Sequence, residues 1–487
     1  DFIAEGVDQT RGWFFTLHAI ATMVFDSVAY KAVISNGLVL DKVGNKMSKR
    51  LGNAVDPFEA IEKYGSDPLR WYMISNSSPW DNLKFDPSGV QESARKMFAT
   101  LYNTYSFFAL YANVDGFDPK APQVPMEKRP EIDRWIISLL NTLISDVETA
   151  LDDYEPTRAA RAIGEFVGDD LSNWYVRLNR KRFWGGGMTE DKLAAYQTLY
   201  QCLETVARLI APIAPFYADR LWRDLQEDNE KSVHLAEFPK ADPTLVDRDL
   251  EERTKLAQTI TSMVLALRRK VNIKVRQPLS TLMVPVTDDT QRKRLEAICN
   301  QVLTEVNVKE MKIVSSDEGV LVKRIKPDFK KLGPKHGKNM KAVAAAISAM
   351  DTAAINAMEK AGYAEVDVNG TPTRVDLCDV EVYSEDIPGW LVANEGTVTV
   401  ALDVTLTPEL KQEGLARDIV NRIQNIRKSR DTFQIATLLI EHDMNLVMGI
   451  CEGICVLNFG QIIAKGTPAD IQANPAVIEA YLGSKRK

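Results

Sequence analysis

The first forty residues read as a strand, a helix and a second strand, and this order strongly limits the folds that the chain can adopt. Phe2-Ile3-Ala4 is a short apolar run, Asp8 to Val28 carries apolar side chains at helical spacing, and Lys31 to Leu40 has a β-branched, strand-like composition. A unit of this size is most simply a right-handed crossover in a parallel sheet. Because such sheets bind ligands at the carboxyl ends of their strands, we expect chemistry in the loop after Leu40.

The remaining pattern predicts a multidomain chain that combines α/β and all-α parts. Helical periodicity dominates from about Pro57 to Leu225, and helices alternate with short strands from Leu250 to about Arg430. Pro-rich stretches at Asp115–Pro130 and Phe238–Asp249 separate segments. We expect a partial Rossmann-type domain at 1–85, a helical bundle at 86–245, a small α+β module at 246–434 and a truncated α/β tail at 435–487.

Composition narrows the class of protein. With 45% hydrophobic and 26% charged residues and no apolar run of membrane-spanning length, the chain is expected to be a cytoplasmic globular protein. The five cysteines are scattered, and together with the four histidines they supply no zinc-ligand set, so no metal site of the protein's own is predicted. The chain begins at Asp1 without a Met, which suggests a fragment. A net charge of −7 means that any nucleic-acid contact must rest on local basic clusters.

The strongest motif is a basic loop at Lys46-Met47-Ser48-Lys49-Arg50, preceded by Asn36–Asp41 and Gly44 and followed by Gly52-Asn53. Two ammonium groups three residues apart can neutralise the charge that develops on a departing pyrophosphate. This order of strand, glycine, Lys-Met-Ser-Lys and Gly-Asn resembles the signature loop of class I aminoacyl-tRNA synthetases. The resemblance implies that Lys46, Met47, Ser48 and Lys49 bind ATP and that Lys46 and Lys49 are catalytic.

The opening segment Glu5–Phe14, which reads Glu-Gly-Val-Asp-Gln-Thr-Arg-Gly-Trp-Phe, resembles the isoleucyl enzymes among the class I synthetases. The resemblance implies that Glu5, Gly6, Asp8 and Gln9 line an aminoacyl-adenylate pocket. The three polar side chains offer acceptors for an ammonium group or ribose hydroxyls, and a glycine permits close approach of a ligand. The competing interpretation is structural: Asp8 caps a helix whose first aromatic residues pack in the core.

A second resemblance concerns RNA. Gly65–Tyr72 and Ser78–Asp81 are similar to the stem-contact segment of the same family, and Asp170–Arg177 with Arg180–Trp184 is similar to its anticodon-binding helical domain. Cationic side chains meet phosphates, and aromatic ones stack on unpaired bases. The predicted tRNA contacts are Arg177, Arg180, Lys181, Arg182 and Trp174, with Tyr175 and Trp184 as further stacking candidates. Aromatic residues on a bundle helix are nevertheless more often core. A basic run at Lys323–Lys338 is either a polyanion contact or a solvated surface.

Two features set limits on activity. None of the four histidines lies in the His-x-Gly-His signature that class I synthetases use to hold ATP phosphates, and the editing domain expected of an isoleucyl enzyme is absent.

The tail from about Ile435 to Leu482 resembles instead the end of ATP-binding-cassette ATPases of branched-chain amino-acid transporters. Its His442 matches a histidine that contacts ATP in that family, but the chain has no phosphate-binding loop of the Walker type.

The leading hypothesis is therefore a C-terminal part of an isoleucine-specific class I synthetase, inactive by itself. Its family implies ATP and Mg²⁺ as cofactors, isoleucine and tRNA(Ile) as partners, no membrane and a monomeric state. A non-catalytic tRNA-binding protein and a fusion to a transporter ATPase remain as alternatives.

Overall fold

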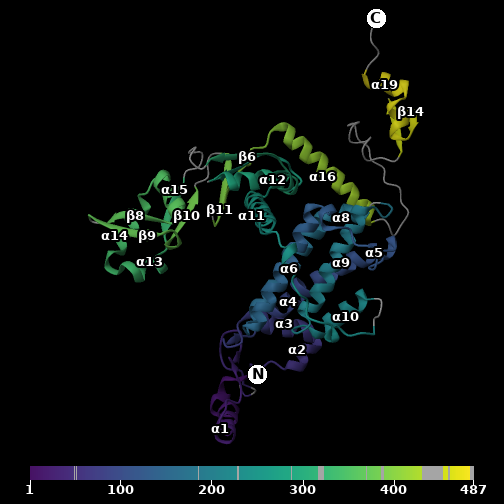
Figure 1. The fold of residues 1–487 in the computed structure, drawn as a ribbon. Coiled ribbons are helices and arrows are strands. Elements are labelled where there is room, and N and C mark those ends of the chain that lie inside the picture. Colours follow the sequence, from purple (N-terminus) through teal and green to yellow (C-terminus); the bar gives the residue numbers. More distant parts are fainter. Residues whose placement is uncertain are drawn as a thin grey trace. The chain divides into compact units, whose positions relative to one another are not determined.

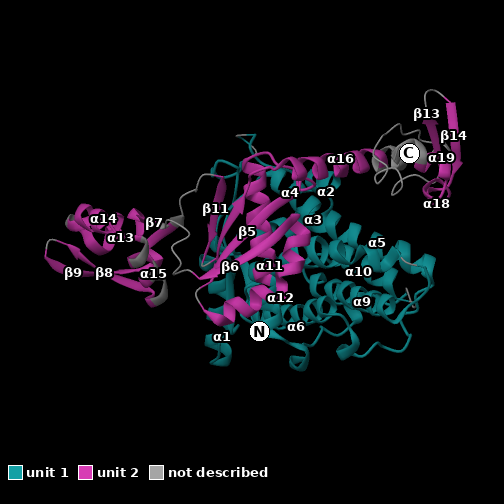
Figure 2. Cartoon of the chain, turned by 90° about the horizontal axis from the view of Figure 1, so that it is seen from above, with its two compact units in different colours: residues 1–254 teal, residues 255–487 magenta. Residues whose placement is uncertain are grey.

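The computed structural model describes residues 1–48, 50, 52–184, 186–226, 230–286, 288–315, 323–368, 370–384, 389–396, 398–429, 453–458 and 461–482. These residues fall into two compact units, 1–254 and 255–487, which Figure 2 colours separately. The predicted division into four segments is finer than this and stays a prediction.

The strand–helix–strand prediction for the N-terminus is confirmed. Strand β1 (Phe2–Gly6) pairs in parallel with β2 (Ala32–Asn36), and helix α1 (Trp13–Phe25) connects them after a 3₁₀ turn at Val7–Arg11. The prediction of one strand up to Leu40 is wrong in its second half. The chain leaves the sheet at Gly37, and the short β3 (Val39–Leu40) pairs in parallel with β4 (Leu83–Lys84) in a separate sheet.

Gly37 explains this break. Its amide donates to the carbonyl of Pro79 at 2.9 Å, so the backbone turns toward the loop 79–82. A Cβ atom at this position would lie only 2.2 Å from the carbonyl oxygen of Asp81. Only glycine allows this close approach, which redirects the chain from one sheet to the next.

The rest of the first unit is helical, as the sequence predicted. Proline occupies the first turn of α2, α4, α7 and α10, where its missing amide proton costs nothing, and Asp56 caps α2 through the amides of Phe58 and Glu59. The helices, several of which Figure 1 labels, are α2 (Pro57–Tyr64), α3 (Ser66–Asn76), α4 (Pro87–Ser93), α5 (Thr100–Asp115), α6 (Glu131–Asp152), α7 (Pro156–Glu165), α8 (Arg177–Trp184), α9 (Glu190–Ile210) and α10 (Pro215–Leu225).

The core of this unit lies between α5, α6, α7 and α9, which contact one another. Trp135, Ile137 and Leu140 on α6 and Leu199 on α9 are almost completely buried. Helices α7 and α8 are joined without a break by a π-helical stretch, η5 (Phe166–Val176), and a second π stretch, η3 (Ala94–Ala99), joins α4 to α5. Residues 156–184 thus form one long helical segment, which carries the predicted RNA-contacting side chains.

The second unit begins within α11 (Arg248–Lys270) and contains a four-stranded sheet in the order β11-β12-β5-β6. Strands β5 (Leu279–Val286) and β6 (Val308–Ser315) are parallel and connected by α12 (Asp289–Val306), whereas β12 (Val398–Asp403) pairs antiparallel with both β11 (Trp390–Glu395) and β5. The predicted strands at 282–286, 306–313 and 397–404 correspond to β5, β6 and β12, although Val306 is the last residue of α12.

Two further groups of elements belong to this unit. One has its own core around Leu332, Val343 and Ile355, and the other pairs β13 with β14 around Ile471. Their elements are β7 (Lys323–Pro327), α13 (Phe329–His336), α14 (Met340–Ser348), α15 (Thr352–Ala361), β8 (Tyr363–Val368), β9 (Thr371–Asp376), β10 (Val380–Ser384), β13 (Ile454–Asn458), β14 (Gln461–Gly466), α18 (Pro468–Gln472) and α19 (Pro475–Leu482). Helix α16 (Pro408–Ser429) is in neither group and is attached beside the four-stranded sheet, where Gln277 Nε2 donates to the carbonyl of Leu410 at 2.6 Å. The predicted strand at 436–440 and His442 lie outside the described residues. Of the helices described, none is both long and apolar enough to cross a membrane.

Candidate functional site

The two parallel strands at the N-terminus end side by side, and the first predicted site segment lies at that edge of the sheet. Glu5 pairs with Ser35 and Gly6 with Asn36, so β1 and β2 end side by side. The polar segment Asp8-Gln9 follows directly after β1, and the chain that leaves β2 leads through β3 into the lysine loop. This edge is the place where ligands of parallel sheets bind.

The side chains of Asp8 and Gln9 fold back over the end of β1. A Cβ atom on Gly6 would lie 2.6 Å from Asp8 Oδ1, so glycine leaves room for this carboxylate. Gln9 Nε2 donates to Asp8 Oδ2 at 3.1 Å, and Gln9 Oε1 accepts from the amide of Trp13 at 2.9 Å. The side chain that accepts from the first amide of α1 is therefore that of Gln9 rather than Asp8, and the N-cap residue itself is Gly12. Glu5 and Asp8 are exposed at the surface of the unit.

The lysine loop is held closed by two side chains, Asp41 and Asn53. Asp41 Oδ1 accepts from the amides of Val43 (3.1 Å) and Asn45 (2.8 Å), which forms a tight turn around Gly44, whose φ is +98°. Asn53 Nδ2 donates to Asp41 Oδ2 at 3.0 Å and so links the two ends of the loop. These hydrogen bonds, with that of Asn53 first, hold the pKa of Asp41 below its usual value.

The predicted ATP-binding residues lie inside this clasp. Asn53 Oδ1 accepts from the amide of Ser48 at 2.8 Å, and its Nδ2 reaches the carbonyl of Lys46 at 3.2 Å. Met47 packs against a core cluster that contains Tyr72. Lys46 is exposed, whereas its neighbour Met47 is partly buried. Lys49 lies outside the described residues, so its role stays a prediction.

Asp41 and Asn53 were not singled out as site residues from the sequence. Both flank the Lys-Met-Ser-Lys signature, and only the chemistry of their side chains could have indicated a structural role. The carboxylate of Asp41 can accept from the backbone amides of a turn, and the side-chain amide of Asn53 can both donate and accept. Spacing alone does not say that the two meet across twelve residues.

The other predicted contact surface is on α8. Arg177, Arg180, Lys181 and Trp184 are all exposed, and their spacing of three, four and seven residues places them on one face of the helix. Arg180 and Lys181 have no acidic partner among the described residues. Trp184 is 57% exposed at the end of this face. We call these four residues the α8 stripe.

Two residues that were predicted as RNA contacts are turned toward the domain: Trp174 is buried, and the side chain of Arg182 is 14% exposed. Arg182 donates to both oxygens of Asp133, at 2.6 and 2.9 Å, and to Asp191 at 2.8 Å. Burial opposes its charge, but hydrogen bonds and the charge of Asp133 raise the pKa of Arg182 above its ordinary value. Trp174 is only 4% exposed, and the Arg177 guanidinium lies 5.9 Å from its ring. In this arrangement neither side chain is presented to a ligand, and Trp184 is the better stacking candidate.

The basic run at Lys323–Lys338 is divided between surface and structure. Lys335 pairs with the buried Asp379 at 2.6 Å, and this contact raises the pKa of Lys335. Lys331 donates to the carbonyl of Cys378 at 2.8 Å. These two lysines thus attach α13 to the segment before β10, which favours the structural interpretation for them.

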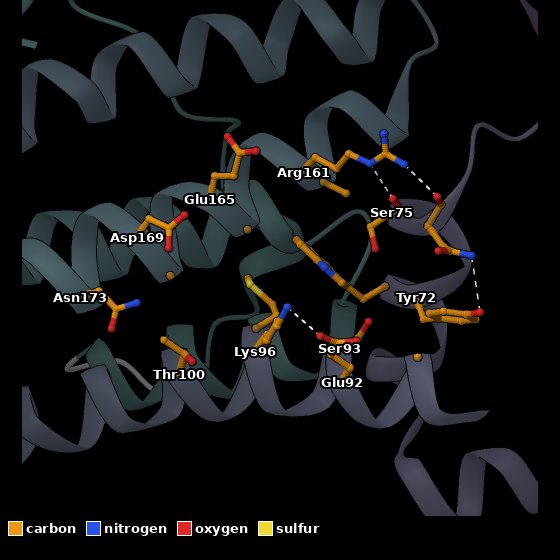
Figure 3. Close-up of a pocket in the computed structure, with 17 residues that line it drawn as sticks. Tyr72, Ser75, Glu92, Ser93, Lys96, Thr100, Arg161, Glu165, Asp169 and Asn173 are labelled. Atoms are coloured by element: carbon orange, nitrogen blue, oxygen red, sulfur yellow. Dashed lines mark hydrogen bonds and ion pairs between the residues drawn. The ribbon is translucent and has the colours of Figure 1, made fainter. Parts of the chain in front are cut away.

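A pocket of about 650 Å³ lies elsewhere in the first unit, between α3, α4 with η3, and α7 with η5 (Figure 3). It contains none of the predicted ATP- or adenylate-binding residues, although Trp71, Tyr72 and Asn173 from the predicted RNA-related segments line it. The two cations that line it already have partners: Lys96 pairs with Glu92 at 2.7 Å, and Arg161 donates to the carbonyls of Ser75 and Asn76. Among the described residues that line it, the pocket therefore offers no free cation for a triphosphate. It is not the predicted ATP site.

The described residues contain no group of three or more His, Cys, Asp or Glu side chains that could hold a metal ion. Magnesium is commonly held by substrate phosphates, waters and only one or two carboxylates. A Mg²⁺ ion that arrives with ATP would need no preformed cage.

Comparison with known protein families agrees with these local features. Residues 1–86 match the model for tRNA synthetases class I (I, L, M and V), and residues 133–283 match the model for the anticodon-binding domain of tRNA ligase. Residues 461–486 match the branched-chain amino acid ATP-binding cassette transporter model, which confirms the separate resemblance of the tail.

Curated relatives extend the match through most of the chain. Isoleucine–tRNA ligase of Bacteroides fragilis is 69% identical over 433 residues, which are 88% of this chain and 38% of that protein. The Porphyromonas gingivalis ligase is 65% identical over 91% of this chain and 39% of its own length, and the Thermus thermophilus ligase is 41% identical over 88% and 41%.

Among solved structures, the ternary complex of Agrobacterium radiobacter K84 agnB2 LeuRS with tRNA and LeuAMS matches with a TM-score of 0.40 at 19% identity, over 51% of this chain and 29% of that one. The chain thus spans about two-fifths of the length of the curated relatives it matches. Over that stretch, from Asp1 to about residue 430, it belongs to the isoleucine–tRNA ligase family of class I tRNA synthetases.

Proposed function

We propose that the chain is the C-terminal part of an isoleucine–tRNA ligase and contributes two functions to it. Residues 1–86 supply the loop that stabilises the transition state of isoleucyl-adenylate formation, and the helical domain binds tRNA(Ile). The observation that carries the proposal is the clasp of Asp41 and Asn53 around Lys46–Ser48.

In the first step, isoleucine and ATP form isoleucyl-adenylate and release pyrophosphate. Negative charge grows on the bridging oxygen as the bond to the pyrophosphate breaks. The exposed ammonium of Lys46, and that of Lys49 in the same signature, would neutralise this charge. The clasp fixes the backbone of the loop, so the lysine need not be reorganised during the reaction. Glu5, Asp8 and Gln9 would contact the adenylate.

Substrates and surroundings follow from the same proposal. ATP would enter with Mg²⁺, isoleucine would be the amino acid, and the protein would act in the cytoplasm as a monomer. Because none of the histidines of this chain lies in a His-x-Gly-His pattern, the chain would not activate isoleucine by itself.

For tRNA binding, the support is the α8 stripe. Three cations within two turns of one helix face can meet successive phosphates, and the exposed Trp184 can stack on an unpaired base. On a chain with a net charge of −7, such a local concentration of cations is the kind of surface that RNA contact requires.

The test measures the affinity of the chain for tRNA(Ile) at several salt concentrations. Replacing Arg180 and Lys181 with Ala should weaken binding and reduce the slope of log K against log salt by about 0.7 for each phosphate that the variant no longer neutralises. The control is Arg95→Ala with Lys96→Ala, two consecutive cations on η3 that are also exposed, of which Lys96 pairs with Glu92. Equally weakened binding in the two double variants, or no binding by the parent chain, would refute the RNA surface.

The alternative is a tRNA-binding protein without a catalytic role. The observation in its favour is that the α8 stripe is complete in this chain, whereas the lysine loop is one part of a larger site. The alternative is supported if tRNA binds but the chain never takes part in adenylate formation with any supplied N-terminal portion.

A further inference from the structure

We propose that the pocket between α3, α4 with η3, and α7 with η5 binds a small organic cation: a primary amine that carries a carbonyl or hydroxyl oxygen close to its ammonium group (Figure 3). This site is separate from the lysine loop and from the α8 stripe, so it goes beyond the function proposed above. Its volume of about 650 Å³ lies in the range of pockets that enclose small-molecule ligands. We call it the α3 pocket.

One wall of the α3 pocket is kept open by two glycines. Gly164 and Gly168 are four residues apart on one face of the helical segment 156–184, and both line the pocket. A Cβ atom on Gly168 would meet no atom within 4 Å, and one on Gly164 would lie 3.9 Å from Trp71 Cζ2, an ordinary contact distance. Neither glycine has a positive φ. Alanine would therefore fit at both positions and would favour the helix, so the glycines serve to leave the ring of Trp71 uncovered.

Both π-helical stretches of the first unit border this pocket. Lys96 and Met97 of η3 line it from one side, and Asp169 and Asn173 of η5 line it from the other. π-Helical turns are rare and occur frequently at functional sites. Two of them, from segments that are distant in the sequence, meet here at one cavity, which favours a binding site over a gap left by packing.

A hydrogen-bond donor without a partner lies at the base of the pocket. Trp71 is only 4% exposed, and its ring is held in place by an edge-on contact with Phe98. Within the described part of the chain, its indole N–H has no hydrogen-bond partner. Cζ2, the ring atom nearest to Gly164, is bonded to the carbon that carries this nitrogen, so the N–H edge is on the side of the glycine wall. A ligand with an acceptor oxygen would satisfy this donor.

Two carboxylates at the rim give the pocket the charge that an ammonium group requires. Glu165 and Asp169 are exposed, and neither forms an ion pair or a side-chain hydrogen bond with the described residues. Figure 3 shows both across the pocket from Lys96, which pairs with Glu92. Arg161 donates to backbone carbonyls. The charges that remain available to a ligand are thus negative, which attracts a cation and disfavours a phosphate.

The test compares two amines that differ in one group. Lysinamide has two ammonium groups and a carboxamide, and cadaverine is the same diamine without the carboxamide. We expect the full chain to bind lysinamide one-to-one in calorimetry, about two- to tenfold more tightly than cadaverine, which corresponds to one additional hydrogen bond. Trp71→Phe removes the N–H and keeps an aromatic ring, so it should abolish this difference and leave the Kd of cadaverine unchanged.

Two further variants test the rim and the glycine wall. Glu165→Gln with Asp169→Asn should weaken the binding of both amines by about three- to tenfold. The matched control, Glu148→Gln with Asp152→Asn, removes the same two residue types at the same spacing from the exposed face of α6 and should leave both Kd values unchanged. Gly164→Leu should fill the groove and weaken binding by at least as much, while the melting temperature stays equal to or above that of the parent, because leucine favours a helix.

The proposal is overturned if lysinamide shows no saturable binding, if the rim variant and its α6 control weaken binding equally, or if Trp71→Phe leaves the preference for lysinamide intact. It is also overturned if Mg²⁺ alone binds to the carboxylates and displaces both amines, since the rim would then be a metal site. If Gly164→Leu weakens tRNA(Ile) binding as much as Arg180→Ala with Lys181→Ala, the groove belongs to the RNA surface and the proposal is likewise wrong.

Discussion

Arg182→Met is expected to destabilise the helical domain strongly, although the sequence predicted this residue as an RNA contact. In the structure Arg182 donates to both oxygens of Asp133, and the side chain of Asp133 is completely buried. The substitution keeps most of the volume and removes the charge. Within the described part of the chain, Asp133 would then retain one side-chain hydrogen bond, from the hydroxyl of Tyr175 at 2.8 Å, and the charge of the buried Arg129 near it.

Breaking a buried ion pair on one side costs about 3–5 kcal/mol, because the remaining charge is left unpaired. For a unit of 254 residues, 1 kcal/mol corresponds to about 2–4 °C in melting temperature, so the expected decrease is roughly 6–20 °C. The double variant Arg182→Met with Asp133→Leu removes both charges and should recover a large part of this loss, since an apolar pair can replace a buried ion pair at little cost.

The assay is thermal and urea unfolding followed by circular dichroism and tryptophan fluorescence. Arg180→Met is the matched control, because it removes the same group from the exposed face of the same helix and should change stability by no more than about 0.5 kcal/mol. If Arg182→Met melts within about 1 °C of the parent, or if the double variant is less stable than the single one, the structural role assigned to Arg182 is wrong.

Three further predictions concern other parts of the chain. Asn53→Ala should open the lysine loop without changing the global melting temperature. Limited trypsin cleavage and hydrogen exchange over residues 41–53 would detect the opening. An unchanged loop would show that the hydrogen bond from Asn53 to Asp41 does not hold it closed. Burial and the charge of Asp133 raise the pKa of Tyr175 well above its usual value of 10.0, so above pH 10 this tyrosine ionises only in the unfolded chain. The difference in unfolding free energy between the parent and Tyr175→Phe should therefore be full below pH 10 and shrink above it by up to about 1.4 kcal/mol per pH unit. A constant difference between pH 8 and 11 would contradict this. Arg268 is 1% exposed and donates to the carbonyls of residues 274, 277 and 307, so Arg268→Met should destabilise the second unit by about 1–3 kcal/mol in urea unfolding, and a neutral effect would contradict this.

The parts of the fold that could be predicted from the sequence are those that periodicity determines. The crossover formed by β1, α1 and β2 and the helices of the first unit were predicted, because apolar spacing decides which side of a segment is buried. The end of β2 was placed four residues too late. Leu38 to Leu40 are apolar and strand-like, but the contact of Gly37 with the loop around Asp81 comes from a distant segment and leaves no local pattern.

The candidate site shows the same limit. The type and order of residues were sufficient to single out Lys46 and the basic helix α8. They could not show that Arg182 is tied to an ion pair while Arg180 is exposed, because the partner of Arg182 is Asp133, some fifty residues away in the sequence. Likewise Trp174 and Trp184 look alike in the sequence, yet one is buried and the other lies at the end of an exposed basic face. Partners that are distant in sequence decide which chemically suitable residue is available to a ligand.

The central claim is that Lys46 belongs to a site for adenylate formation, and the most direct measurement is isoleucine-dependent ATP–pyrophosphate exchange. The chain would be assayed in complex with the N-terminal part of the Bacteroides fragilis ligase. The account predicts no exchange by either component alone, exchange by the complex with isoleucine, and a loss of about 10²–10³-fold on Lys46→Ala with the complex intact. An intact complex that shows no exchange, or exchange that Lys46→Ala leaves unchanged, would contradict it.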